Sequence, residues 1–135
     1  MDKIQFIWDD EAHTALRVEW YPNWTWDDYD YAIKKAVEML GEQIATIPTI
    51  NVYHPGTRLP KGSPIPHFNR MARKMPQNVA VLVTQDPVTA REVSIFIRMS
   101  GYEDGVNFWV VPTLEEARRV VREYLDKKSS QGQAE

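Results

Sequence analysis

The sequence predicts a single α/β domain: a five-stranded, mixed and mainly parallel sheet with four helices, in the order ββαβαβαβα. Three observations support this prediction. From residue 25 onward, segments with the apolar period of a helix alternate with short, mostly β-branched runs typical of strands. Two short segments of alternating apolar and polar residues come before them. The length of 135 residues and the apolar fraction of 43% suit one globular domain with one core.

The two alternating segments span residues 4–8 and 15–20. The short polar connection between them has the length of a hairpin loop, so we expect the two strands to pair antiparallel at one side of the sheet. The acidic residues of this connection, Asp9, Asp10 and Glu11, are interpreted as a solvated turn. Consecutive acids in a turn point in diverging directions, which disfavours a cation site.

The first helix is predicted to begin after Thr25 and to end at Gly41. Thr25 and Asp28 can satisfy the free backbone amides at its start. Its apolar residues form a continuous stripe, comprising Tyr29, Ala32, Ile33, Ala36, Val37 and Leu40. A β-branched strand over residues 47–53 follows, and then a long loop over 54–63, which in a compact domain is often functional.

Ser63 is placed to cap the second helix, with Pro64 at its first position and Pro76 beyond its end. The buried side of this helix is expected to carry Phe68, Met71, Ala72 and Met75. The next segment, residues 79–83, is an almost wholly apolar run, typical of a central strand covered on both faces.

Asp86 and Pro87 predict the start of a third helix that ends near Gly101. A fifth strand is expected over residues 106–110. Thr113 and Glu116 then match a capping box at the start of the last helix. The domain is predicted to span residues 1–127, and the Ser- and Gln-rich residues 128–135 are predicted to form a disordered tail.

Composition excludes several functional classes. The chain has no cysteine, so disulfides, thiolate metal sites and cysteine nucleophiles are ruled out. Its three histidines are widely separated, and we expect neither a metal site nor a cofactor. The chain has no secretory signal pattern and no apolar stretch of ~20 residues, so we expect a cytoplasmic protein that does not insert into a membrane.

No catalytic constellation can be recognised in the sequence. Neither a Gly-x-Ser-x-Gly nucleophile motif nor a phosphate-binding glycine loop is present. Ser63 and His67 lie one helical turn apart and form a weak candidate pair. The absence of these patterns favours a binding function over an enzymatic one.

Charge is unevenly distributed along the chain. Residues 43–85 contain five Lys or Arg residues and no acid, whereas residues 1–42 contain ten acids and four bases. This pattern indicates either an ordinary solvated patch or a positive face that binds an anionic ligand or a protein partner. The candidate residues are Arg58, Lys61, Ser63, His67, Arg70, Arg73 and Lys74. Nucleic acid is not expected, because the acidic remainder would repel its phosphates.

Residues 20–26 are rich in aromatic side chains, with three tryptophans and a tyrosine. Some of these rings are expected in the core. Trp24 and Trp26 are candidates for an apolar surface that contacts a partner or a second copy of the chain in a homodimer.

The element order, with its leading hairpin and long loop before the second helix, resembles the STAS domain. The most specific segment is Phe108-Trp109-Val110-Val111-Pro112-Thr113-Leu114-Glu115-Glu116-Ala117, which is similar to the final strand and helix of stand-alone bacterial anti-sigma-factor antagonists. The resemblance implies a non-catalytic regulatory module that binds a protein. The alternative is a small α/β enzyme or anionic-ligand-binding protein that uses residues 54–74.

Regulatory STAS domains are phosphorylated on a serine at the start of the helix after the third strand, usually in an Asp-Ser-Ser-Gly-like motif. The serine at the equivalent junction here is Ser63, in Lys61-Gly62-Ser63-Pro64, and the preceding acidic residue is missing. Ser63 is therefore interpreted as a helix cap rather than a phosphorylation site.

Overall fold

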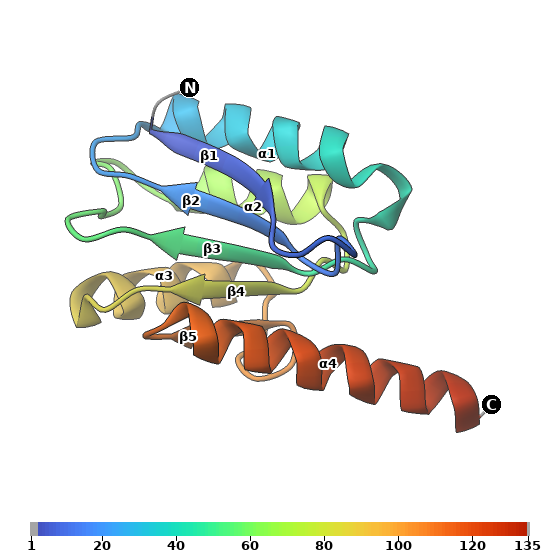
Figure 1. Cartoon of the computed structure of the whole chain (residues 1–135). Coiled ribbons are helices and arrows are strands. Elements are labelled where there is room, and N and C mark those ends of the chain that lie inside the picture. Colours follow the sequence, from blue (N-terminus) through green and yellow to red (C-terminus); the bar gives the residue numbers. More distant parts are fainter. Residues whose placement is uncertain (1–2, 135) are drawn as a thin grey trace.

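The structure is a computed structural model that describes residues 3–134, with side chains through residue 131. It contains five strands and four α-helices in the predicted order (Figure 1). A single turn of 3₁₀ helix, Gly41–Gln43, follows the first helix. The elements are β1 (Ile4–Trp8), β2 (Leu16–Trp20), α1 (Trp26–Leu40), β3 (Thr49–Tyr53), α2 (Ile65–Lys74), β4 (Ala80–Val83), α3 (Pro87–Met99), β5 (Phe108–Val111) and α4 (Leu114–Ala134).

The five strands form one mixed sheet in the order β1-β2-β3-β4-β5. β1 pairs antiparallel with β2, and the remaining three pairs are parallel. The predicted mainly parallel sheet with a leading hairpin is therefore confirmed. Because β2 to β5 run in the same direction, their carboxyl ends, and the loops that follow them, lie along one edge of the sheet.

The sheet is covered unequally on its two faces. α1, α2 and α3 pack on one face, and α4 lies on the other (Figure 1). The α4 side has its own small core, comprising Ala15, Ile50, Val81, Val83, Ala117 and Val121. Since α4 packs over β4 and β5, the outward side chains of β1 and β2 on this face are not covered by a helix: Arg17 and Glu19 on β2, and Gln5 and the exposed Ile7 on β1.

The starts of α1 and α3 form as the sequence predicts, and the predicted capping box of α4 forms in part. The Thr25 hydroxyl accepts a hydrogen bond from the Asp28 amide, and the Asp28 carboxylate accepts one from the Thr25 amide, which completes a capping box at α1. The Asp86 carboxylate caps α3. At α4, the Thr113 hydroxyl accepts from the Glu116 amide.

The start of α2 differs from the prediction. The residue at the cap position is Pro64, and it forms no side-chain cap. The Ser63 hydroxyl, one residue earlier, accepts a hydrogen bond from the Ile65 amide at 3.3 Å. Ser63 thus satisfies one amide of the first turn from outside the helix.

The end of the chain also differs. α4 continues to Ala134, into the segment predicted to be a disordered tail. Residues 126–131 are exposed, so no burial accounts for this extension. Residues 128–134 mix good helix formers with Ser129, Ser130 and Gly132, which are less favourable, so helix preference does not explain the extension either. Among residues 3–134, no helix combines the length and apolar character needed to cross a bilayer.

Candidate functional site

A pocket lies at the carboxyl edge of the parallel strands. Its volume is about 490 Å³, and its walls come from the ends of β3, β4 and β5, over residues 52–57, 83–86 and 112–114. At this position α3 leaves the sheet toward one face and α4 toward the other. Ligands of parallel α/β proteins bind where helices diverge in this way.

Both helix N-termini at the pocket are already capped by side chains. Asp86 accepts hydrogen bonds from the Val88 amide at 3.1 Å and the Thr89 hydroxyl at 2.7 Å. The Thr89 hydrogen bond, aided by the Val88 amide and the charge of Arg58, lowers the pKa of Asp86 despite partial desolvation. Asp86 therefore places a negative charge on the pocket wall at neutral pH, with the Arg58 Nε 3.8 Å away.

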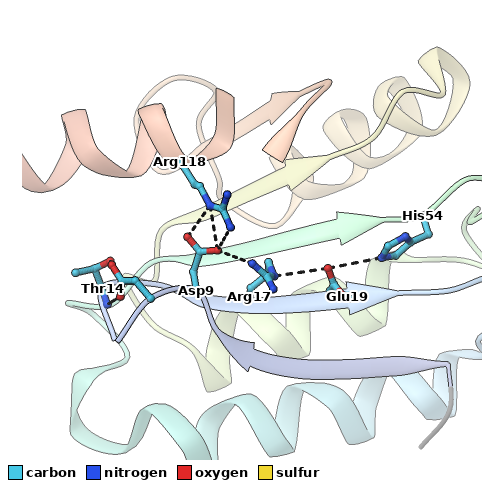
Figure 2. A network of polar contacts seen from close by, with 7 residues as sticks. Asp9, Thr14, Arg17, Glu19, His54 and Arg118 are labelled. Atoms are coloured by element: carbon cyan, nitrogen blue, oxygen red, sulfur yellow. Dashed lines mark hydrogen bonds and ion pairs between the residues drawn. The ribbon is translucent and has the colours of Figure 1, made fainter. Parts of the chain in front are cut away.

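A chain of charged side chains crosses the α4-facing side of the sheet (Figure 2). Asp9 is shared by two arginines: Arg17 Nη1 lies 2.7 Å and Arg118 Nη2 lies 2.9 Å from its Oδ1. Glu19 then bridges Arg17, at 3.6 Å from Nε, and His54, at 3.7 Å from Nε2. Positive and negative side chains alternate from Arg118 through Asp9 and Arg17 to Glu19. His54 ends the chain and lines the pocket.

Asp9 is the centre of this chain. Its side chain is 9% exposed, so the prediction of a solvated turn was wrong for this residue. Partial burial raises the pKa of Asp9, but the hydrogen bonds and positive charges of Arg118 and Arg17 outweigh that effect and lower it overall. The Asp9 pairs tie the hairpin end and β2 to α4.

The structure corrects part of the predicted positive surface. Asp30, on α1, lies 2.8 Å from Arg70 Nη1 and 3.0 Å from His67 Nδ1. Arg70 and His67 are therefore paired with a carboxylate, because α1 packs beside α2 and supplies the acid that the segment 43–85 lacks. Both side chains therefore join α2 to α1 and are not free cations.

Three of the predicted cations remain available. Lys61, Arg73 and Lys74 are exposed, and none has an acidic partner within 4.0 Å among the described residues. Lys61 lies in the loop before α2, and Arg73 and Lys74 lie in its last turn. We refer to these three residues, which lie near the two opposite ends of α2, as the α2 basic surface.

The two candidate interface tryptophans have different positions. Trp24 is 3% exposed and packs against Trp20 and Tyr29, so it belongs to the core and is not available to a partner. Trp26 is only partly buried. Its ring stacks on His67 with centroids 4.6 Å apart, and its Nε1 donates to the Lys61 carbonyl at 3.1 Å. Trp26 therefore holds the long loop against α2.

The possible catalytic pair is not assembled. Asp30 orients His67 through Nδ1, as a carboxylate does for a general base. The Ser63 hydroxyl, however, is hydrogen-bonded to the Ile65 amide, and no hydrogen bond joins it to His67 within the described part of the chain. Residues 3–134 also contain no cluster of three or more His, Asp or Glu side chains that could hold a metal ion.

No protein-family model, curated protein or solved structure matches the chain. The function is therefore argued from geometry.

Sequence reasoning missed the charged chain of Figure 2. One signal for it was present: Arg17 and Glu19 alternate with the buried Leu16, Val18 and Trp20, which places both charges on the same outer face of β2. No local signal pointed to Arg118, which is 109 residues from Asp9 in the sequence.

Proposed function

We propose that the protein is a non-catalytic regulatory or protein-interaction module of the STAS type that acts in the bacterial cytoplasm. In this proposal the α2 basic surface binds an acidic surface of a partner protein. The observation that carries the proposal is that Lys61, Arg73 and Lys74 are exposed and have no acidic partner among the described residues. By contrast, Arg58, His67 and Arg70 each lie beside a carboxylate. Unpaired surface cations steer an acidic partner and fix its orientation.

The arrangement around His67 supports binding rather than hydrolysis. His67 is held between Trp26 and Asp30, and Ser63 is engaged with the backbone of α2. These contacts stabilise the loop and the helix start that carry Lys61. The absence of the acidic residue before Ser63 favours a partner contact that does not depend on phosphorylation.

Reversing two charges of the α2 basic surface should weaken partner binding. We expect Arg73→Glu with Lys74→Glu to weaken binding of any partner recovered by the wild-type protein by about tenfold or more, because two attractive contacts become repulsive. Binding by the wild-type protein should also weaken as the salt concentration rises. Quantitative affinity capture, followed by titration with the purified partner, measures both effects.

Arg91→Glu is the matched control, since Arg91 is an exposed arginine on a different helix, α3. It should leave binding unchanged. The Arg73→Gln with Lys74→Gln variant removes both cations without adding anions at the C-terminal end of α2, where negative charges destabilise a helix, so it separates loss of attraction from the effects of added negative charge. Equal binding by the double reversal and the wild-type protein would rule out this surface.

The pocket at the strand ends favours a second candidate function, binding of a small anionic ligand. Its volume of about 490 Å³ suits a small metabolite, and the dipoles of α3 and α4, whose N-termini are capped by Asp86 and Thr113, favour an anion that the charge of Asp86 opposes. Asp86→Asn retains a capping side chain and removes the negative charge. We expect phosphorylated metabolites to raise the melting temperature more in this variant than in the wild type.

A thermal-shift screen provides this measurement. If no phosphorylated compound stabilises either the wild type or Asp86→Asn, the anionic-ligand function is wrong, and the proposal for the α2 basic surface is unaffected. Glu92→Gln, which removes an exposed charge further along α3, is the control.

A further inference from the structure

A cavity lies in the core between the sheet and the layer formed by α1, α2 and α3. Its volume is about 70 Å³. Small side chains leave this space, since Ala32 and Ala36 of α1 and Ala80 of β4 are part of its wall. Native cores contain few voids larger than a water molecule, so a space of this size is a specific feature of the packing.

The walls of the cavity are mostly apolar. Among the described residues, no charged side chain lines it. Two of its polar residues are already satisfied: the Thr49 hydroxyl donates to the Asn78 Oδ1 at 3.1 Å, and the Asn78 amide donates to the carbonyls of Ile44 and Ile47. A charged ligand would therefore find no counter-ion, whereas a neutral one would meet a favourable surface.

Asn51 is the polar residue of the wall that still has a free group. It lies in the middle of β3, between β2 and β4, where its Oδ1 accepts a hydrogen bond from Trp20 Nε1 at 3.1 Å. Within the described residues its amide nitrogen has no protein acceptor. Asn51 nevertheless retains accessible surface on a covered strand, and it lines the cavity. Its free donor therefore faces the cavity.

Two tyrosines add further donors to the wall. Tyr29 and Tyr53 both line the cavity and are 5% and 9% exposed. Burial raises the pKa of both hydroxyls, so they remain protonated donors over the physiological pH range. An apolar space with hydrogen-bond donors in its wall is typical of a ligand-binding cavity.

We propose that this cavity binds a small, neutral molecule with an apolar body and one hydrogen-bond acceptor, which is held by the amide nitrogen of Asn51. Such a molecule contacts the apolar walls as well as the donor of Asn51, whereas a water would use only the polar groups of Asn51, Tyr29 and Tyr53. The volume is roughly half of the ~150 Å³ that holds a benzene ring in an engineered protein cavity, so the ligand has few heavy atoms. Met71 and Met75 line the cavity and can adapt their flexible side chains to it.

Acetone and 2-methylpropene are suitable probes, because each has four heavy atoms and they differ only by the carbonyl acceptor. Titration of methionine-methyl-labelled protein is followed by NMR. Acetone is expected to shift the methyl signals of Met71 and Met75 in a saturable manner. Met99 is an internal control, since it is 60% exposed and does not line the cavity.

Two variants test the location and the hydrogen bond. Ala36→Leu fills the cavity and should abolish the shifts; Ala36→Val is the smaller replacement if the leucine variant does not fold. Asn51→Leu should weaken acetone binding by about fivefold and leave 2-methylpropene binding unchanged. The absence of a saturable shift in the wild type, or its persistence in a folded Ala36→Leu protein, would overturn the proposal. Equal affinity for the two probes would overturn the role of Asn51.

Discussion

Replacing Trp20 by alanine is expected to lower the free energy of unfolding by about 3–5 kcal/mol, the largest effect of any variant considered for this protein. Trp20 is 2% exposed and ends β2 at the centre of an aromatic cluster. Its ring centroid lies 4.9 Å from that of Trp24, 5.6 Å from that of Tyr29 and 5.9 Å from that of Tyr53. Truncation removes all three contacts and leaves a cavity between the sheet and α1.

Urea unfolding measures this effect as a lower midpoint with an unchanged slope. Tyr31→Ala is the control, because Tyr31 is an aromatic residue of α1 that is 53% exposed. Its substitution should change stability by less than about 0.5 kcal/mol. A Trp20→Ala protein as stable as the Tyr31→Ala protein would show that the aromatic cluster is not part of the stabilising core.

A comparison of two Trp→Phe variants isolates the hydrogen bond. Trp20 Nε1 donates to Asn51 Oδ1, whereas Trp24 Nε1 is buried without a partner among the described residues. Both substitutions remove a similar volume, but only Trp20→Phe leaves an acceptor unpaired. We therefore expect Trp20→Phe to cost about 1–2 kcal/mol more than Trp24→Phe.

Replacing Asp9 by alanine should cost about 2–3 kcal/mol of stability. Asp9 accepts from both Arg17 and Arg118, and removal of the shared carboxylate leaves Arg17, whose side chain is 16% exposed, without its closest partner. Breaking a largely buried ion pair from one side costs more than the pair contributes, because the remaining charge stays desolvated. Arg118 is 43% exposed and recovers its hydration more easily.

Equilibrium unfolding of Asp9→Ala, Arg118→Ala and the double variant measures the coupling between the two side chains. Glu11→Gln is the control, since Glu11 is an exposed acid of the same turn. If Asp9→Ala and Glu11→Gln proteins are equally stable, Asp9 is a solvated turn residue, as the sequence alone suggests.

The same pairs make stability depend on pH. The pKa of Asp9 is lower in the folded protein than its ordinary value, so the folded state favours the ionised carboxylate. This contribution is fully present above the pKa of the unfolded chain, about 3.9, and is lost as the pH falls through the lower folded pKa. The stability difference between the wild type and Asp9→Asn should therefore shrink below about pH 4. A difference that is constant from pH 7 to pH 3 would contradict the ion pairs.

The sequence predicted the fold well because its signals are local. The period of α1, the apolar run of β4, and the caps at Thr25 and Asp86 each depend on residues a few positions apart. Strand limits were less certain. β3 begins at Thr49 and β5 at Phe108, two residues later than predicted in each case, because strand ends depend on the partner strand rather than on propensity.

The candidate site was predicted only in part. The acid-free segment 43–85 was visible in the sequence, but Asp30 of α1 neutralises Arg70 and His67, and Asp86 lies beside Arg58. The burial of Trp24 could not be derived from the alternation within 20–26, because the chain leaves β2 at Trp20 and turns into α1.

By itself, the sequence determined the identity and order of the helices and strands, since each is encoded by periodicity and capping over neighbouring residues. Only the tertiary structure decided which charges are free. Asp30 and Arg70 are 40 residues apart, and Asp9 and Arg118 are 109 residues apart. Such pairs form because the connections between parallel strands bring distant elements together. The residues around each partner do not indicate where two elements meet.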